Sequence, residues 1–354
     1  MKRTAPLEEI EVVAPNFNRR LSGVTSTIAR LVPVQREAID IVATGVGLPD
    51  DVPQMSRRAV MTLGRKPHPT RPFRILHARR NVEMLFALAV RAVAPRNWRL
   101  VFTSASQRDH TSYTRWLIAR MDAVIATSRA TARYLDRPST VILHGIDTDA
   151  FRPVEDRTAL RQELGLPRGR LLGCFGRVRR QKGTDLFVDA MLRLLPERPG
   201  WNAVVFGRAT EQHLGFERDL KTRVAAAGLS DRILFPGEVP VDAVARRYAA
   251  LDLFVAPQRW EGFGLTPLEA MACGVPVVAT DVGAFPELLT KETGKLVPRD
   301  DLTAMVEATG AMMDDDGRRD VMGRAARAHM EANFTIQGEA DAITAVYLRL
   351  WAEG

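Results

Sequence analysis

The chain has 354 residues, 46% of them hydrophobic and 26% charged, which suits two domains of about 150 to 200 residues with sizeable cores. No apolar run approaches the roughly 20 residues that a membrane-spanning helix needs, and the basic N-terminus lacks the apolar stretch of a signal peptide. The two cysteines, Cys174 and Cys273, lie far apart, which argues against a disulfide framework or a zinc site and favours a reducing cytoplasm.

The charge is unevenly placed along the chain. Residues 1–150 hold 23 Lys+Arg against 13 Asp+Glu, a balance of +10, whereas residues 151–354 hold 27 against 29, a balance of −2. A basic first half favours an anionic partner, which could be nucleic acid, a phospholipid surface or an acidic substrate. The alternative is a solvated surface that is rich in arginine.

Short apolar runs alternate with helical stretches in the first half, which predicts βα units on a parallel sheet. Helices are expected between the strands, for example at 24–35 and 81–93. The expected strands cover residues 10–15, 39–45, 73–78, 100–104, 123–128 and 140–145.

The segment 147–170 is polar and carries prolines, so it predicts a linker with one short helix. The alternation then restarts, and the expected strands cover residues 170–177, 202–207, 232–237, 251–257 and 275–281. The pattern predicts an α/β protein with domains at 1–150 and 151–333, followed by a last helix at 334–351. Ligands of open α/β sheets bind beyond the carboxyl ends of the strands, and two such sheets facing each other would form a cleft.

The strand at 170–177 leads into the loop GRVRRQKG. It carries Arg177, Arg179, Arg180 and Lys182, and Gly183 and Thr184 then begin an amphipathic helix with Thr184 as its N-cap. Helix N-termini attract phosphate through free N–H groups and the helix dipole, and the added cations predict an anion site. The alternative is a solvated basic loop.

The stretch EGFGLTPLE contains two glutamates. Glu261 precedes two glycines in a loop after a strand, where a backbone can approach a ligand closely, and a carboxylate there can accept hydrogen bonds from two hydroxyls of a sugar. Thr266 and Pro267 predict a helix start in which Glu269 completes a capping box, so Glu269 has an explanation that requires no ligand.

The motifs GRVRRQKG, FGRAT, EGFGLTPLEAMACGVPVVATDVGAFPELL and TGKLVP, in this order within residues 171–300, resemble the retaining nucleotide-sugar glycosyltransferases of the GT4 family. The resemblance implies the GT-B fold, with two Rossmann-like parallel-sheet domains facing across a cleft. It implies that the first domain binds the acceptor, that the second binds the nucleotide sugar, and that the final helix packs back on the first domain. It also implies no metal and no cofactor.

The resemblance assigns roles by position. Arg177 and Lys182 would hold and neutralise the leaving diphosphate, Glu261 would contact the hydroxyls of the transferred sugar, and Glu269 would bind the ribose, a role that we favour over the capping box. The other positions implied to lie against the donor are Gly23, Gly176, Gly183, Phe263, Gly264 and Leu265.

The first half departs from the family at one position, because Ala105 stands where relatives carry a histidine. His110 is a candidate to replace it, and the alternative is a surface histidine. Further candidates for the acceptor side are Ser22 in the glycine-containing loop, and His77 and Arg79 at the end of another strand. For His144, which precedes the linker, we favour a hinge residue bonded to backbone.

Stretches of the first half, among them APNFNRRLSGVTSTI, ILHARRNVEML and HGID, are similar to the lipopolysaccharide core mannosyltransferases of alpha-proteobacteria. The similarity implies transfer of mannose from GDP-mannose to the inner Kdo of the lipid A–core acceptor. Such an acceptor is anionic, and the basic pairs Arg19-Arg20, Arg57-Arg58, Arg65-Lys66 and Arg79-Arg80 would suit it or the inner leaflet around it. A cytoplasmic protein, peripheral on the inner face of the inner membrane, is therefore expected.

Three alternatives remain at this point. One is a GT4 enzyme with a UDP-sugar donor. A second is an epimerase or phosphorylase of the same fold, which would need further acid–base residues or a longer chain. The third is a basic nucleic-acid-binding protein, but the basic residues are not interleaved with aromatics and no groove-binding motif is present, so no nucleic acid partner is expected.

Overall fold

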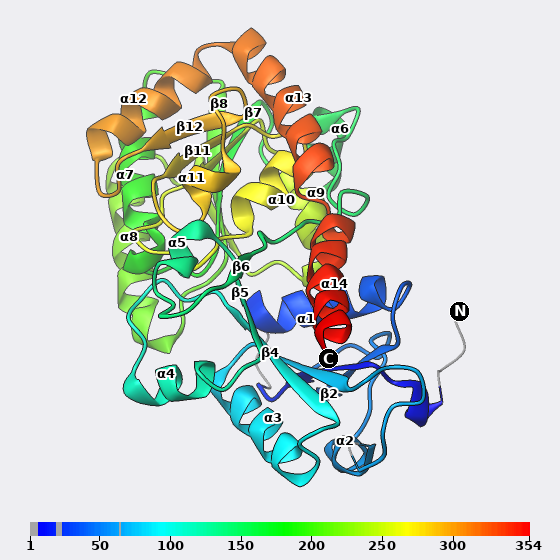
Figure 1. The fold of residues 1–354 in the computed structure, drawn as a ribbon. Coiled ribbons are helices and arrows are strands. Elements are labelled where there is room, and N and C mark those ends of the chain that lie inside the picture. Colours follow the sequence, from blue (N-terminus) through cyan, green and yellow to red (C-terminus); the bar gives the residue numbers. More distant parts are fainter. Residues whose placement is uncertain (1–5, 19–22, 64) are drawn as a thin grey trace. The chain divides into compact units, whose positions relative to one another are not determined.

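The computed structural model describes residues 6–18, 23–63 and 65–354. Its internal contacts divide the chain into two units, of which unit 1 combines Met1–Gly145 with Ile336–Gly354 and unit 2 comprises Ile146–Thr335 (Figure 1). Each unit is built on one six-stranded parallel sheet, which confirms the predicted α/β class for both halves. The last helix of the chain is grouped with unit 1.

The sheet of unit 1 has the strand order β2-β1-β3-β4-β5-β6. All six strands lie where the apolar runs predicted them: β1 Val12–Asn16, β2 Ile41–Gly45, β3 Arg74–Ala78, β4 Trp98–Ser104, β5 Ala123–Ala126 and β6 Thr140–Val141. Every residue of β1 and β3 is buried, because helices cover both faces of the sheet and leave neither face to water.

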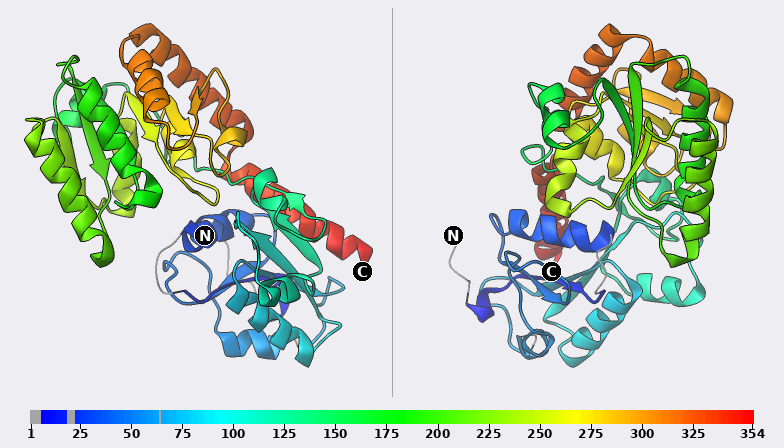
Figure 2. Two further views of the ribbon diagram at one scale, coloured as in Figure 1. Left: turned by 90° about the vertical axis from the view of Figure 1, so that its left-hand side faces the viewer. Right: turned by 180° about the vertical axis from the view of Figure 1, so that it is seen from behind.

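Two apolar clusters cover the two faces of this sheet. Successive strand residues point to opposite faces, so Val13 packs in a cluster with α2, α3 and α4, whereas Val12 packs in a cluster with α1 and α14. Figure 2 shows α14 beside α1, its neighbour in unit 1. The helices of unit 1 are α1 Gly23–Gln35, α2 Arg57–Leu63, α3 Asn81–Val93, α4 Ser112–Ile118, α5 Arg129–Ala132 and α14 Ile336–Glu353.

The sheet of unit 2 has the order β12-β11-β10-β7-β8-β9. Its strands are β7 Arg170–Phe175, β8 Trp201–Phe206, β9 Ile233–Gly237, β10 Leu253–Ala256, β11 Val277–Thr280 and β12 Gly294–Val297. The first five were predicted and β12 was not. Its four residues begin with a glycine and include an exposed lysine, so it lacks an apolar run and depends on pairing with β11.

Helices flank this sheet as well, and α7, α8, α12 and α13 contribute to the main apolar cluster of unit 2. The expected short helix of the linker is α6, whose N-cap Asp156 accepts hydrogen bonds from the amides of Thr158 and Ala159. The helices are α6 Arg157–Glu163, α7 Thr184–Leu194, α8 Leu214–Ala226, α9 Val244–Ala249, α10 Thr266–Ala272, α11 Phe285–Leu288, α12 Leu302–Met313 and α13 Asp316–Asn333. No helix in the described part of the chain has both the length and the hydropathy that crossing a bilayer requires.

Candidate functional site

Two loops of unit 2 leave the carboxyl ends of β7 and β10, which are neighbouring parallel strands. We call residues 176–183 the β7 loop and residues 257–265 the β10 loop. Gly183 has a φ of 68°, and a Cβ at this position would lie 1.7 Å from the carbonyl oxygen of Pro257. Only glycine permits this conformation together with this close approach, so Gly183 holds the two loops in contact.

Arg259 links the two loops a second time. Its guanidinium donates to both carboxylate oxygens of Asp185, at 2.6 and 3.1 Å, and to the backbone carbonyl of Arg180 at 2.5 Å. It also pairs with Asp300. Bidentate arginine–carboxylate pairs fix geometry as well as contributing energy. The sequence analysis did not identify this residue, because no local pattern shows that Asp185 lies opposite it.

Lys182 and Glu261, which the resemblance places in one site, do lie together. The ammonium group of Lys182 contacts Oε2 of Glu261 directly, and the two side chains are 22% and 17% exposed. The other oxygen, Oε1, accepts a hydrogen bond from the amide of Gly262 at 3.1 Å. The β7 loop and the β10 loop therefore bring a cation and a carboxylate to one partly solvated position.

The remaining cations of the β7 loop have no such partner. Arg177 is exposed, and the Nε of Arg179 is buried without a hydrogen bond. Among the described residues neither side chain makes a hydrogen bond or an ion pair. Burial and the neighbouring Arg177 lower the pKa of Arg179, whereas Glu261 opposes them. The loop thus carries positive charge beyond what Glu261 neutralises, which an anionic ligand could complete.

Two further glycines of these loops, Gly176 and Gly264, have positive φ angles. Gly176 has a φ of 132° with open space around it, whereas a Cβ on Gly264, with a φ of 92°, would lie 2.3 Å from the ring of Phe285. Phe263 is 5% exposed and its carbonyl accepts the amide of Ala284 at 3.1 Å. Its side chain is thus part of the packing of unit 2.

Both predicted helix starts are wrong in detail. The N-cap of α7 is Gly183, in the left-handed conformation after a 3₁₀ turn, and Thr184 lies buried inside the helix. The N-cap of α10 is Leu265, which is already helical, and the hydroxyl of Thr266 is buried without a partner. There is therefore no capping box to explain Glu269.

Glu269 lies near Tyr248 instead. Burial raises the pKa of the Tyr248 phenol well above its ordinary value, and the negative charge of Glu269 raises it further. The hydroxyl of Tyr248 is fully buried and makes no hydrogen bond of normal geometry. The carboxylate thus sits in the first turn of α10, at the end of the β10 loop, next to a buried phenol.

Two candidates of unit 1, His77 and Arg79, are buried in the structure, and their expected contact with a ligand stays a prediction. His77 is fully buried, and its ring nitrogens contact the hydroxyls of Tyr347 at 2.5 Å and Thr103 at 2.6 Å. Burial lowers the pKa of His77 well below its ordinary value, and Arg79 lowers it further. Arg79 is 8% exposed, and its amide donates to Glu83 at 2.8 Å. Both ring nitrogens of His77 thus have partners within unit 1, and the guanidinium of Arg79 lies 3.5 Å from the His77 carbonyl.

The other candidates of unit 1 differ from one another. His110 is half-buried, its Nε2 makes no hydrogen bond with the described residues, and burial lowers its pKa. Gly23 is the first residue of α1, and Ser22 lies outside the described residues, as does the pair Arg19-Arg20. For His144 the structure places Nδ1 2.7 Å from the carboxylate of Glu339 on α14, and the expected hinge role stays a prediction.

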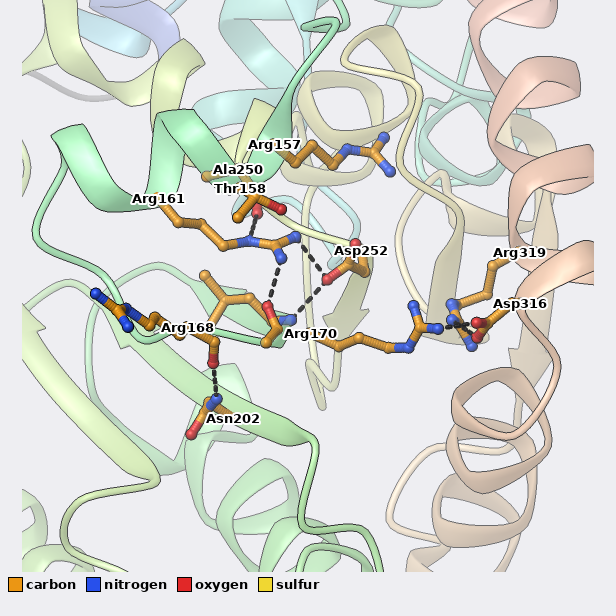
Figure 3. Close-up of polar contacts among 12 residues, drawn as sticks. Arg157, Thr158, Arg161, Arg168, Arg170, Asn202, Ala250, Asp252, Asp316 and Arg319 are labelled. Carbon is orange, nitrogen blue, oxygen red and sulfur yellow. Dashed lines mark hydrogen bonds and ion pairs between the residues drawn. The ribbon is translucent and has the colours of Figure 1, made fainter.

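A cavity of about 370 Å³ lies at the opposite edge of the same sheet, at the amino ends of β7, β10 and β11. None of the predicted site residues lines it. Figure 3 shows the polar contacts beneath it, where Arg161 binds the carbonyls of Gly169 and Ala250 and the carboxylate of Asp252. Within the described ranges, no group of three or more His, Cys, Asp or Glu side chains is arranged to hold a metal ion.

Known proteins show the same combination of motifs and fold. The family model of the group 1 glycosyl transferases matches residues 169–315. The lipopolysaccharide core biosynthesis mannosyltransferase LpsB of Rhizobium meliloti is 58% identical over 346 residues, which are 96% of this chain and 98% of LpsB. The corresponding enzyme LpcC of Rhizobium leguminosarum bv. viciae is 51% identical over 343 residues, 96% of this chain and 97% of LpcC.

The fold has a solved counterpart in HepE of Anabaena, crystallised with UDP. The TM-score is 0.83 at 19% identity, with 96% of this chain and 100% of the HepE chain covered. At this identity the likeness concerns the fold alone, and it agrees with the two parallel six-stranded sheets and their flanking helices. The chain therefore belongs to the group 1 glycosyl transferases, the GT4 family that its motifs resemble, and has the GT-B fold.

Proposed function

We propose that this glycosyltransferase moves mannose from GDP-mannose to the inner Kdo of a lipid A–core acceptor, with retention of the anomeric configuration. The observation that carries the proposal is the 58% identity, over nearly the whole of both chains, to a lipopolysaccharide core biosynthesis mannosyltransferase. A second such enzyme at 51% identity over a similar span supports it.

The chemical problem is the departure of a diphosphate. As the glycosidic bond to the donor loosens, the sugar becomes oxocarbenium-like and negative charge grows on the leaving group. Arg177 has no ion-pair partner in the described part of the chain, and Lys182 lies on the same loop, which makes both available to that charge. Preorganised charges of this kind are usually the largest single contribution to catalysis. We assign the stabilisation of the diphosphate to these two residues.

The contact between Lys182 and Glu261 then describes the state before the donor binds. The diphosphate would take over the ammonium group, and the released carboxylate would accept hydrogen bonds from hydroxyls of the mannose. Exchange of one anion for another keeps the lysine neutralised throughout, which limits the desolvation cost of binding. Glu269, at the end of the same loop, is assigned to the ribose hydroxyls.

We further propose that the reaction is independent of divalent metal ions, since two side-chain cations of the β7 loop supply the neutralising charge. The acceptor hydroxyl attacks from the face that the diphosphate leaves, and the departing phosphate takes its proton. The anionic acceptor is assigned to unit 1 on account of the excess of basic residues in the first half, and its lipid part implies contact with the inner leaflet. No nucleic acid takes part.

The test is a transfer assay with a Kdo-bearing lipid A precursor and three donors, GDP-mannose, UDP-glucose and UDP-galactose, with and without EDTA. We expect transfer from GDP-mannose alone, unchanged by EDTA, and an α-linked product by NMR. Transfer only from a UDP-sugar would refute the donor assignment, and loss of transfer in EDTA would refute metal independence. The Lys182→Ala variant, for which we expect much slower transfer, serves as the control.

A further inference from the structure

The outward face of α3 has no polar residue. Its inward side chains Met84, Ala87 and Val90 are buried in the core of unit 1. All the exposed positions of this helix are apolar and follow the three-to-four spacing of one helical stripe: Val82, Leu85, Ala89, Ala92 and Val93. A surface helix normally carries polar residues on the side away from the core, so this helix has a second apolar face that the fold of unit 1 does not use.

The neighbouring helix α4 adds aromatic side chains. Tyr113 and Trp116 are 50% and 45% exposed, and their rings are stacked with centroids 6.3 Å apart and planes at 12°. Asn81 donates to the hydroxyl of Thr114 at 2.8 Å and so joins the amino ends of the two helices. We call the apolar stripe of α3 together with Tyr113 and Trp116 the α3–α4 face.

Basic residues accompany this face. Arg115 lies on α4 and Arg120 lies two residues beyond its end, and both are exposed, whereas Arg91 on α3 pairs with Asp122. The guanidinium of Arg120 lies 4.0 Å from the ring centroid of Trp116 and donates to the carbonyl of Trp116 at 2.9 Å. The ion pair of Arg115 with Asp136, at 3.8 Å, is open to solvent. Positive charge is thus held directly beside the exposed aromatic rings.

We infer that the α3–α4 face binds the surface of an anionic phospholipid bilayer. Tryptophan and tyrosine are enriched where hydrocarbon meets headgroups, small apolar side chains enter the acyl boundary, and arginine interacts with anionic lipid heads. A second copy of the chain suits the face less well, because a twofold contact would press two surfaces that both carry exposed arginines against each other.

The inference deepens the proposed function, because it relies on that proposal for a lipid-borne acceptor and names the surface that would meet the membrane. Its own evidence is the composition of the face. The binding test below contains neither donor nor acceptor, so the two proposals fail separately. Binding of vesicles without mannose transfer would contradict the proposed function alone, and transfer by a protein that ignores vesicles would contradict the inference alone.

The first experiment is flotation of the full chain with vesicles of phosphatidylglycerol and phosphatidylethanolamine, compared with phosphatidylcholine vesicles. We expect binding to the anionic vesicles that weakens as salt is added. The double variants Tyr113→Ser with Trp116→Ser, and Val82→Ser with Leu85→Ser, should lower the partition coefficient at least about tenfold, because they remove the apolar area that enters the interface.

A matched control removes two exposed valines of unit 2, Val241 and Val321, which are 77% and 58% exposed. The double variant Val241→Ser with Val321→Ser should bind vesicles as the parent does. Thermal unfolding of each variant shows whether it is folded. The inference would be overturned if the parent did not float with anionic vesicles. It would also be overturned if vesicle binding fell equally in the α3–α4 face variants and in the control.

A second measurement needs no destabilising change. Vesicles that contain brominated lipid should quench part of the tryptophan fluorescence of the parent, and the Trp116→Phe variant should lose that quenching. Trp260→Phe removes the other tryptophan that is more than a third exposed and should retain it. Quenching that survives Trp116→Phe would contradict the proposed surface, as would a parent dimer that only the α3–α4 variants dissociate.

Discussion

Arginines gather at both edges of the sheet of unit 2, and the two groups are arranged in opposite ways. At the amino ends of the strands, Arg161 is 5% exposed and its guanidinium meets two carbonyls and the carboxylate of Asp252. At the carboxyl ends, Arg177 and Arg179 have no hydrogen bond or ion pair with the described residues. An arginine whose donors are used within the protein stabilises the fold, whereas one whose donors are unused is available to a ligand.

The two ends should therefore respond differently to mutation, and the largest expected effect is at the amino ends. Arg161→Ala should lower the free energy of unfolding by about 3–5 kcal/mol, because it leaves a largely buried carboxylate at Asp252 without its partner. Urea denaturation followed by circular dichroism measures this. Arg246→Ala is the matched control, since it breaks an exposed pair with Glu163 and should leave the unfolding midpoint nearly unchanged. Equal midpoints for the two variants would remove the contrast between the edges.

At the carboxyl ends of the strands, we expect mutation of a cation to lower the transfer activity and to leave the free energy of unfolding unchanged. Arg177→Ala and Lys182→Ala should each lower kcat/KM for GDP-mannose by about 10²–10³, the loss typical of one preorganised donor at a developing charge. Steady-state kinetics at matched unfolding midpoints measures this. Arg193→Ala, an exposed cation at the far end of α7, is the control and should behave as the parent. If a variant had a lower unfolding midpoint but the kcat/KM of the parent, the cation that it lacks would stabilise the fold and not the leaving diphosphate.

The contact of the two loops predicts a smaller and separable effect. Gly183 and Gly165 have nearly the same φ, 68° and 63°, but a Cβ meets Pro257 at the first and nothing within 4 Å at the second. Gly165→Ala should lower the free energy of unfolding by about 1–2 kcal/mol, because alanine is strained in the left-handed conformation. Gly183→Ala should cost more than this and lower transfer as well, because the β7 and β10 loops must separate. Similar costs and normal transfer for both variants would show that the loop contact is unimportant.

The smallest effect is expected at the two buried cysteines, Cys174 in β7 and Cys273 at the end of α10. Burial raises the pKa of both Cys174 and Cys273 to about 12, so neither thiol should react with Ellman's reagent at pH 8 until the protein unfolds. The unfolded thiols ionise near pH 9, so the two cysteines stabilise the fold fully below pH 9 and lose this contribution between pH 9 and about pH 12. Rapid labelling of the folded protein at pH 8 would show that the two sites are open to solvent.

Much of the fold followed from short stretches of sequence. Eleven of the twelve strands coincide with apolar runs, because a strand covered on both faces needs apolar residues at successive positions. The exception, β12, has four residues with a glycine and a lysine among them. It forms because β11 offers an open edge, which no property of its own residues indicates.

The candidate site was predictable in part. The β7 and β10 loops and the residues Lys182 and Glu261 were identified from motifs. The structure brings these two side chains into contact, and their roles stay a prediction. The bidentate pair of Arg259 and Asp185 was missed because its members are 74 residues apart in the chain. The contact of His77 with Tyr347 was not foreseen for a similar reason, since Tyr347 lies on a helix 270 residues further on.

By itself, the sequence determined the succession of βα units and the loops in which cations, glycines and glutamates occur. These features depend on residues that are close in the chain, where propensity and periodicity act. Only the tertiary structure decided which of the many arginines are neutralised, that His77 is a core residue, and that Gly183 rather than Thr184 precedes α7. Those outcomes depend on which groups meet across the fold, and such pairings are set by the approach of loops and helices that are distant in sequence.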